Sequence, residues 1–570
     1  MKRSISLILA AALLLTLFSG CGRKVNEPVM AGEGTFGVGE EDSAEVSQAP
    51  SARSEGTFSM PFNASYGWNP YNCIGMENQA VMQLVYEGLF TLNNSFEAEP
   101  LLCKSYEVSD DGYEYRLELV TAKFSSGKDL SSADVVWSME QAEESELYGF
   151  RLTDVRSVTT DGPTTVVITM SNPNDRLPCL LTFPILPSYS SMDSGPLGTG
   201  PFVREGTERL TVNPNWWQGP ENLSIRGVTL YSSISAEDTR DNFEIDNVHF
   251  VYNNPNATTT ATYHSDYELW NSRSTIMQYV GFNRREGVFT NDILRCAVTR
   301  AIDRTTIAET VYRNFADAAV LPTHPFSSLY DETLAADYAF TSVRAAREEF
   351  LTSPDFYNDP AYRLPGQEEP ETEETLTEEE QLLQELLQEE EAAAAAAAAA
   401  QEDEEGKEDK KPEKVTYNNI VMMVRTGNLK RVAAARQVAQ CLTDVGFTVT
   451  IREYEGDSYY YQLATSEWDL FYDEAMIRPD LDLRAILLTD GRLNPTGFES
   501  TEELEELFDK ALENTGNHYD LFKLIMDQGW MCPVLFINNA VFTTRGVFTG
   551  LDPTPSSLFY HIQDVRINRG

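Results

Sequence analysis

The pattern that most restricts the fold of this chain lies in residues 415–454. Residues 415–424 and 447–454 are rich in apolar and β-branched side chains, which predicts two strands. Residues 428–445 repeat apolar side chains at helical spacing, and Gly446 ends the predicted helix. A strand, a helix and a second strand in this order form a parallel βαβ unit, so the sequence predicts an α/β fold with a parallel sheet.

Length and charge limit both the number of cores and the classes of partner. The chain has 570 residues, which is too many for a single core and predicts several lobes. It carries 43 Lys and Arg against 89 Asp and Glu, a net charge of −46. Because phosphate repels such a chain, we expect no nucleic-acid partner and no binding to an anionic membrane face. Residues 366–414, acidic with an alanine run, are expected to form a solvated insertion; a partner-binding helix is the alternative.

The N-terminus has the pattern of an export signal. Two basic residues precede an uncharged apolar run at residues 5–18. A membrane-spanning helix needs about 20 apolar residues, whereas the core of a signal peptide has roughly 7–15, so we interpret residues 1–20 as a signal peptide. The small residues before Cys21 resemble a bacterial lipobox, which implies that the Cys21 thiol carries a lipid; an incidental cysteine is the alternative. Residues 21–55 are poor in large apolar side chains and predict a flexible tether.

Signatures of catalysis and metal binding are absent from the sequence. It has no H-E-x-x-H, G-x-S-x-G or P-loop motif, its five histidines are not paired at metal-ligand spacing, and its cysteines are scattered. Ser125 and Lys128 form an S-x-x-K pattern, but the partner motifs of penicillin-interacting serine enzymes are missing. We therefore expect no enzyme, no cofactor and no metal site, and keep a serine hydrolase as an alternative that mutation of Ser125 would test.

A series of short motifs gives a more specific indication, because they occur in one order along the chain. They are VYEGLFTLN, EPLLCKSYEVSDDGYEYRLEL, KFSSGKDLSSADVVWS, PLGTGPF, NPNWW, YVGFN and NDILRCAVTRAIDRTTI. Together they resemble the solute-binding proteins of peptide and nickel ABC importers, bacterial extracellular solute-binding protein family 5. The matching stretches cover most of the chain on both sides of the acidic insertion.

The resemblance implies an α/β fold of the periplasmic-binding-protein-like kind (class II, cluster C), with two hinged lobes and an extra small α/β domain. Lobe I is predicted from residues 56–82, 200–282 and 533–570. Domain II, the small domain, is predicted from residues 83–199, and lobe III from residues 283–532, which include the acidic insertion.

The same resemblance implies a function in solute capture. We expect a lipid-anchored monomer on the outer face of the cell membrane, which contacts the membrane only through the Cys21 lipid. It would bind a peptide or a related small solute, such as a nickel chelate or an oligosaccharide, between its lobes and deliver it to an ABC permease. A sensor or chaperone-like lipoprotein of the same fold, which hands its ligand to a receptor, is the alternative.

The segment EWDLFYDEAMIRPDLDL is expected to contribute to the ligand cleft. In peptide-binding relatives the corresponding segment carries an aspartate that pairs with the peptide amino group. An ungapped count puts Arg478 at that position, and Asp480 serves if the loop is shifted. Because a guanidinium binds a carboxylate through two hydrogen bonds, Arg478 predicts an anionic or neutral ligand. The alternative is that Arg478 lies in solvent.

Further candidates come from aromatic residues and from a strand near the expected lobe crossing. Tyr66, Trp68 and Tyr71 cluster in a loop that enters lobe I and are expected to wall the cleft, with core or hinge packing as the alternative. Tyr279 and Asn283 are expected to offer backbone groups to an extended ligand, which would pair as an added strand.

Overall fold

The structure is a computed structural model that describes residues 29–30, 56–189, 195–257, 262–352, 419–489, 491, 493–494 and 499–568. The predicted signal peptide, Cys21, the acidic insertion and most of the predicted tether lie outside the described residues. Within the described ranges, no helix is both long and apolar enough to cross a membrane. The cysteines of this part of the chain are all free thiols.

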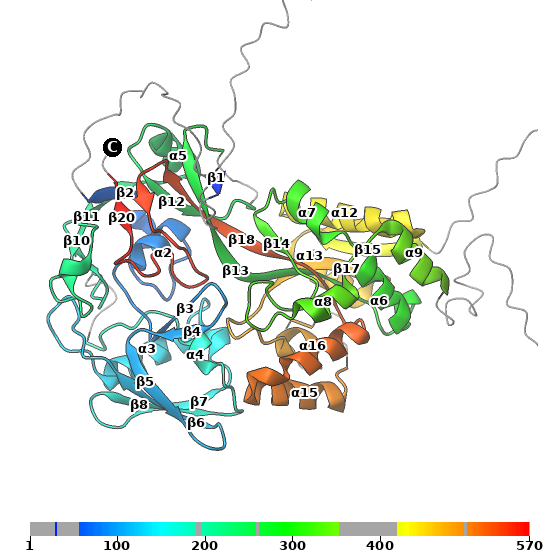
Figure 1. Ribbon diagram of the computed structural model, residues 1–570, viewed down its shortest axis with the longest axis horizontal. Coiled ribbons are helices and arrows are strands. Elements are labelled where there is room, and N and C mark those ends of the chain that lie inside the picture. The colour runs from blue at the N-terminus through cyan, green and yellow to red at the C-terminus, as the bar shows by residue number, and fades with distance from the viewer. Residues whose placement is uncertain are drawn as a thin grey trace, which may run out of the picture.

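One large sheet connects the two ends of the molecule. Its strands lie in the order β12 (Phe250–Asn253), β18 (Cys532–Thr544), β13 (Tyr267–Phe282), β17 (Leu470–Met476), β15 (Asn419–Arg425) and β16 (Thr448–Tyr454), while β1 (Val29–Met30) and β14 (Ala316–Ala318) pair at its sides. The long strands β13 and β18 pair antiparallel and run side by side from one body of the molecule to the other (Figure 1). They therefore form the link on which the two bodies are held. We keep the names lobe I, domain II and lobe III for the bodies described below, and the predicted boundaries between them stay predictions.

The predicted βαβ unit is confirmed in lobe III. Strands β15 and β16 pair in parallel, and helix α12 (Leu429–Val445) connects them. The side chain of Asn428 accepts hydrogen bonds from the first backbone N–H groups of α12, and Gly446 ends the helix with φ at 123°. Both ends of the helix are thus fixed by capping residues, Asn428 and Gly446, that can be recognised in the sequence.

Lobe III buries its sheet on both faces. Consecutive residues of a strand point to opposite faces, so Val280 and Tyr472 enter one apolar cluster while Tyr279 and Phe471 enter another. Besides α12, the helices that cover these faces are α6 (Asp292–Ala301), α7 (Arg304–Thr310), α8 (Glu332–Tyr338), α9 (Val343–Thr352), α13 (Gly456–Thr465), α14 (Arg484–Leu487), α15 (Glu502–Glu513) and α16 (His518–Asp527).

Lobe I contains a smaller mixed sheet and the C-terminal segment. The strand order is β2 (Thr57–Phe62), β11 (Gly227–Ser232), β10 (Arg209–Val212) and β9 (Phe202–Glu205). Helices α2 (Met76–Met82) and α5 (Ala236–Glu244) and the strand pair β19 (Phe548–Thr549) and β20 (Arg566–Ile567) complete it. Short 3-10 helices along the chain lie at Ala64–Tyr66, Gly149–Arg151, Pro220–Asn222, Val288–Thr290 and Thr515–Asn517.

Domain II is a four-stranded antiparallel sheet with one covering helix. The strands are β5 (Cys103–Val108), β6 (Glu114–Leu119), β8 (Thr165–Met170) and β7 (Val155–Thr160), and the helix is α3 (Ser132–Glu143). Helix α4 (Leu177–Leu180) and the hairpin of β3 (Phe90–Leu92) and β4 (Ala98–Pro100) lie beside it. Ser131 and Asp134 form a capping box at the start of α3, which fixes where that helix begins.

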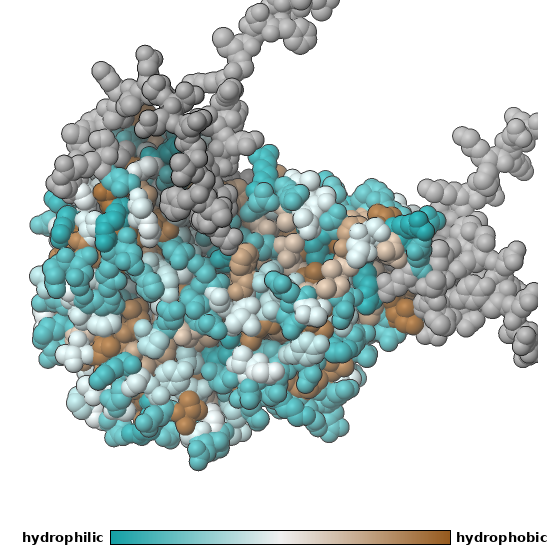
Figure 2. Space-filling view, in the orientation of Figure 1, coloured by the Kyte–Doolittle hydropathy of each residue, from teal (hydrophilic) through white to brown (hydrophobic). Residues whose placement is uncertain are grey.

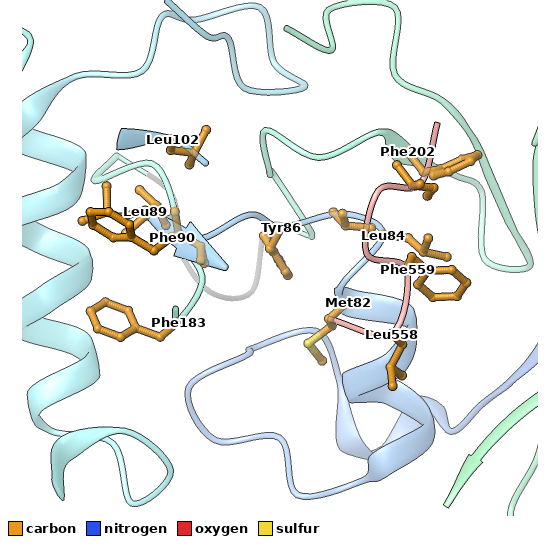
Figure 3. Close-up of a cluster of buried hydrophobic side chains, with 14 of the residues drawn as sticks. Met82, Leu84, Tyr86, Leu89, Phe90, Leu102, Phe183, Phe202, Leu558 and Phe559 are labelled. Atoms are coloured by element: carbon orange, nitrogen blue, oxygen red, sulfur yellow. The ribbon is translucent and has the colours of Figure 1, made fainter. Parts of the chain in front are cut away.

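Domain II and lobe I share one apolar core. Leu89, Phe90, Leu102 and Phe183 gather on the side of domain II, and Met82, Leu84, Phe202, Leu558 and Phe559 on the side of lobe I, with Tyr86 between them (Figure 3). Lobe III has its own clusters on the two faces of the large sheet. A hinge motion at β13 and β18 would therefore move lobe III against lobe I and domain II together. The outer surface on the face in Figure 2 is mostly hydrophilic, with small apolar groups scattered over it.

Candidate ligand-binding site

A cavity of about 580 Å³ lies where lobe I, domain II and lobe III meet. Lobe I contributes Met82, Tyr252 and Phe559, domain II contributes Phe90, Tyr148 and Arg151, and the side of lobe III contributes Ile276, Met476 and Pro479. Its volume and its mixture of apolar and polar lining are those of a site for a small organic ligand, for which roughly 300–1,000 Å³ is usual. Because lobe III forms part of the wall, a movement of lobe III away from the other two bodies would open the cavity on that side.

Strand β13 opens onto this cavity at an irregularity in its pairing. The register with β18 shifts between Arg273 and Met277, and the intervening Ser274, Thr275 and Ile276 line the cavity. The Ser274 hydroxyl donates to the Ile537 carbonyl at 2.6 Å and accepts from the Ile276 N–H at 3.1 Å. The hydroxyl thus replaces part of the regular ladder, and the irregular stretch lies at the crossing between the lobes.

A buried carboxyl group forms one polar part of the wall. Both oxygens of Glu87 accept hydrogen bonds from indole N–H groups, Trp216 at 3.0 Å and Trp217 at 2.9 Å. Burial raises the pKa of Glu87, and these hydrogen bonds counteract the shift. Glu87 belongs to the VYEGLF motif and the tryptophans to NPNWW, so two sequence motifs meet at one group in the cavity wall.

Two arginines from different bodies also line the cavity. Arg151, at the end of a 3-10 helix in domain II, donates to the Thr182 hydroxyl at 2.9 Å and lies 5.0 Å from the centre of the Tyr148 ring. Arg273 of β13 donates to the Asn94 side-chain oxygen at 3.1 Å. Burial lowers the pKa of Arg151. Neither arginine is among the residues predicted from the sequence: the polar run WNSRST inside an otherwise apolar strand marks Arg273, whereas no local pattern marks Arg151.

A second polar group lies where domain II contacts lobe III. We call it the arginine cluster; its members are Asp154 of domain II and Arg478, Asp480, Asp482 and Arg484 of lobe III. Arg478 contacts Asp154 at 2.6 Å, Asp480 through both of its carboxylate oxygens, and Asp482 at 3.7 Å. Arg484 contacts Asp154 at 2.6 Å and Asp482 at 3.0 Å. Charges of both signs alternate through the cluster, and all of its members are largely buried.

Domain II supplies further support around the arginine cluster. Asn174 donates to Asp480 at 2.9 Å, and the Arg176 side chain donates to the Asp480 backbone carbonyl at 3.1 Å. Burial alone would raise the pKa of Asp480, but the charge and hydrogen bonds of Arg478, together with Asn174 and Arg176, lower that pKa. For Arg478 burial alone would lower the pKa, and the Asp480 carboxylate raises it instead.

An apolar contact between the same two bodies lies close by. Phe96, in the turn between β3 and β4 of domain II, is fully buried in an apolar cluster of lobe III. Its ring lies 4.5 Å from the His324 ring, centre to centre, and its carbonyl accepts from Arg176 at 2.8 Å. Phe96 has a left-handed backbone with φ at 60°, which a non-glycine residue adopts at some cost. The packing of its ring against lobe III offsets that cost.

Arg478 and Asp480, predicted as ligand-binding residues, lie in the arginine cluster. Neither is among the residues that line the cavity, whereas their neighbours Met476 and Pro479 are. Arg478 is 7% exposed, so the alternative that it lies in solvent is wrong. Its charge is compensated by carboxylates of the protein itself, and Asp480 already accepts from Arg478 and Asn174. A ligand group would have to displace these partners.

The predicted aromatic residues lie around the cavity rather than in its wall. Tyr66 is exposed, Trp68 packs against Phe62 with ring centres 4.6 Å apart, and Tyr71 is buried and donates to the Pro184 carbonyl at 2.7 Å. The cavity-lining residue of this loop is Pro70. Trp68 and Tyr71 therefore make packing contacts, and a role of the three aromatic side chains in binding a ligand stays a prediction.

Tyr279 and Asn283 have backbone partners within the protein. Tyr279 is opposite Asp473 of β17 on one side and Pro533 of β18 on the other, so an extended ligand finds no strand edge there. Asn283 donates to the Trp468 carbonyl at 2.9 Å, and its N–H donates to the Asp469 carbonyl at 2.8 Å. Neither residue is among those lining the cavity, and a binding role for them stays a prediction.

The S-x-x-K pattern does not form a catalytic pair. Ser125 lies in a turn, and its backbone N–H donates to the Gly198 carbonyl at 2.8 Å. The Lys128 ammonium lies 3.6 Å from the centre of the Tyr189 ring. Among the described residues, no group of His, Cys, Asp and Glu side chains is placed to hold a metal ion.

Two lobes joined by two long strands, with a cavity between them and an extra small domain, define the architecture of a hinged periplasmic-binding-protein-like fold. The chain belongs to the bacterial extracellular solute-binding proteins of family 5: the model of the middle region of this family matches residues 97–482. This confirms the resemblance found in the sequence motifs. The family consists of substrate-binding proteins, which are not enzymes.

Individual relatives support the same assignment. The glutathione-binding protein GsiB of Escherichia coli K12 is 26% identical over 276 residues, 44% of this chain and 52% of that protein, and GsiB of Shigella flexneri is 25% identical over the same lengths. The chain thus spans about half the length of the curated relatives it matches. Among solved structures, HbpA2 from Haemophilus parasuis has a TM-score of 0.65 at 16% identity, covering 90% of this chain and 100% of that one. The nickel ABC transporter from Bacillus halodurans has a TM-score of 0.65 at 17% identity, covering 88% and 98%. These structural likenesses show the fold.

Proposed function

We propose that this protein captures a small solute in the cavity between its lobes and presents the loaded form to the permease of an ABC importer. The observation that carries this proposal is the position of the cavity. It lies at the crossing of β13 and β18, with the joint body of lobe I and domain II on one side and lobe III on the other. A ligand that touches both sides therefore favours the closed arrangement.

We propose that direct contacts between domain II and lobe III stabilise the closed arrangement. Phe96 and Asp154 of domain II meet lobe III, and both must leave it if lobe III swings away on β13 and β18. A ligand can shift such an equilibrium only by its difference in affinity for the two states. A permease that touches both lobes would then distinguish loaded from empty protein by shape.

The ligand we propose is a peptide or a related small solute. GsiB proteins bind glutathione, which is peptide-like, and the cavity volume fits a ligand of that kind. The class of ligand and the delivery to a permease are both part of what we propose.

We further propose that the protein is a monomer anchored on the outer face of the cell membrane. The support is the apolar run at residues 5–18 followed by Cys21, with residues 21–55 as a tether. A lipid on Cys21 would hold the protein near its permease. Cys21→Ser should release the protein into the soluble fraction, and mass spectrometry of the mature N-terminus should find a diacylglycerol on wild-type residue 21.

The experiment that tests solute capture is mass spectrometry of the small molecules that co-purify with the full mature protein, followed by small-angle X-ray scattering of the stripped and reloaded forms. We expect a bound solute and a smaller radius of gyration when it is added back. Failure of every co-purified or added solute to bind, or an unchanged radius of gyration on saturation, would contradict the proposal.

A further inference from the structure

Arg151 is partly buried and differs from the fully buried Arg295, Arg304, Arg431 and Arg478 in the number of its donors that find an acceptor. Arg295 donates to the carbonyls of Phe289, Thr290, Gln528 and Gly529. Arg304 donates to backbone carbonyls in the same way, and Arg431 and Arg478 contact carboxylates. An arginine carries several N–H donors in a fixed fork. In these residues the protein supplies oxygen atoms for most of that fork.

For Arg151 the described part of the chain supplies a single oxygen atom. Nη1 donates to the Thr182 hydroxyl, and Nε is buried without a hydrogen-bond partner. No carboxylate of the described residues lies within ion-pair distance of it. Asp480 is the carboxylate that acts on Arg151 electrostatically, but that group is already held by Arg478 and Asn174. Arg151 thus lines the cavity with N–H donors that have no acceptor in the described ranges and a charge that no nearby carboxylate there compensates.

The acidic side chains in the cavity wall do not serve as acceptors for Arg151. Both oxygens of Glu87 are taken by indole N–H groups. Glu99 accepts from the Tyr560 hydroxyl at 2.5 Å and from the Asn93 side chain at 3.2 Å. Leaving a guanidinium partly desolvated without an acceptor costs free energy, and a bound anion that supplies two oxygen atoms recovers it.

We propose that the cavity selects ligands that carry a carboxylate group, and that Arg151 is the residue that binds this carboxylate. The proposal rests on the proposed function above and names the ligand class for the same site. Arg151 lines the cavity from the side of domain II, so the carboxylate would lie at that end of the cavity. The rest of the ligand then extends toward the apolar wall of Met82, Met476 and Phe559.

The test uses the full mature protein, stripped of co-purified solutes, and its intrinsic tryptophan fluorescence. The probes are a panel of small carboxylic acids, from amino acids to tripeptides, and the matching amide of each. A third set, amidated peptides that contain one aspartate, separates a terminal carboxylate from a side-chain carboxylate. The variants are Arg151→Gln and Arg151→Lys, with Arg344→Gln as a control of equal charge on an exposed helix surface, where Arg344 is 88% exposed. Circular dichroism verifies that each variant is folded.

We expect wild-type protein to bind the best acid about ten- to a hundredfold more tightly than its amide, the effect of losing a charge-assisted hydrogen bond. Arg151→Gln should abolish this preference by weakening binding of the acid far more than binding of the amide, Arg151→Lys should keep part of it, and Arg344→Gln should match wild type. If wild type binds acids and amides equally, or if Arg151→Gln retains the preference, this inference is overturned while solute capture stands. If no probe binds wild type but a co-purified solute without a carboxylate does, this inference fails while solute capture stands; if no probe and no co-purified solute binds, both fail.

Discussion

Near the junction of domain II and lobe III, Arg478 is buried and Arg151 is partly buried, and the protein surrounds these two arginines with opposite kinds of partner. Arg478 is surrounded by Asp154, Asp480 and Asp482, which compensate its charge. Arg151 receives one hydroxyl from the protein and no carboxylate from the described residues. The first arrangement holds two bodies of the protein together, and the second leaves a charge that an incoming molecule can compensate.

The comparison shows that an arginine near a cleft is not by itself a ligand site. What distinguishes the two residues is the balance of partners, because a guanidinium whose donors are used by the protein gains little from a ligand.

Removing the charge of Arg478 should have the largest effect on stability. Arg478→Met leaves Asp154, Asp480 and Asp482 buried without their main counter-charge, which should lower the free energy of unfolding by about 4 kcal/mol. Urea unfolding followed by tryptophan fluorescence measures this loss. The double variant Arg478→Met with Asp480→Leu should regain part of it, because it removes a buried charge as well. Wild-type stability in the single variant would show that the arginine cluster does not hold domain II to lobe III.

Phe96 tests the apolar part of the same contact. Phe96→Ala removes a fully buried ring from lobe III, which should cost about 3 kcal/mol. Since the ring belongs to domain II and packs in lobe III, its removal should destabilise the closed arrangement in particular. The radius of gyration of the ligand-free protein should therefore increase. Phe202→Ala is the matched control: it removes a ring from the core shared by lobe I and domain II and should lower stability without opening the molecule. Equal radii of gyration for Phe96→Ala and Phe202→Ala would contradict this role.

Local patterns in the sequence predicted local structure well. The βαβ unit followed from apolar spacing with Asn428 and Gly446 at the two ends of one helix, and all of that information lies within a few tens of residues. The ordered motifs predicted the family, because each motif is a short stretch of residues that can be read directly from the sequence.

The site was predicted less well, since its partners are far apart along the chain. Asp154 meets Arg478 across 324 positions, and nothing in either stretch indicates the other. One signal was present: the run RPDLDLR alternates charges with leucines, and Leu481 and Leu483 are buried. Charges that alternate with buried leucines favour a self-compensated cluster over a ligand site. For Arg151 the informative fact is a missing partner, which a sequence cannot display.

The acid response of the closed arrangement should be smaller than the effect of either substitution. Burial would raise the pKa of Asp154, but Arg478 and Arg484 lower it, and the pKa of Asp480 is lowered as well. The contribution of Asp154 and Asp480 to the stability of the closed arrangement is therefore complete above the ordinary aspartate pKa of about 3.9. It is lost as the pH falls through their lowered pKa values. Asp482 acts in the opposite sense, because burial raises its pKa.

We expect the radius of gyration of the ligand-free protein to stay constant between about pH 7 and pH 5 and to increase below about pH 4. Scattering across this range measures it. Arg478→Met should flatten the response, because the carboxylates then lose the cation that lowers their pKa. A change centred near pH 6 would point to a histidine instead of the arginine cluster.

Replacing Arg151 in the ligand-free protein should have the smallest effect, and its sign should be the reverse of that for Arg478. Arg151→Met removes a guanidinium whose desolvation the protein does not compensate, so the free energy of unfolding should stay equal or rise by up to about 1 kcal/mol. Arg295→Met is the contrast among buried arginines, because it strips several backbone carbonyls of their donor and should destabilise the protein. Urea unfolding of both variants beside wild type measures the difference. If Arg151→Met destabilised the ligand-free protein as much as Arg295→Met, its guanidinium would be bound by the protein itself, and the contrast with Arg478 would disappear.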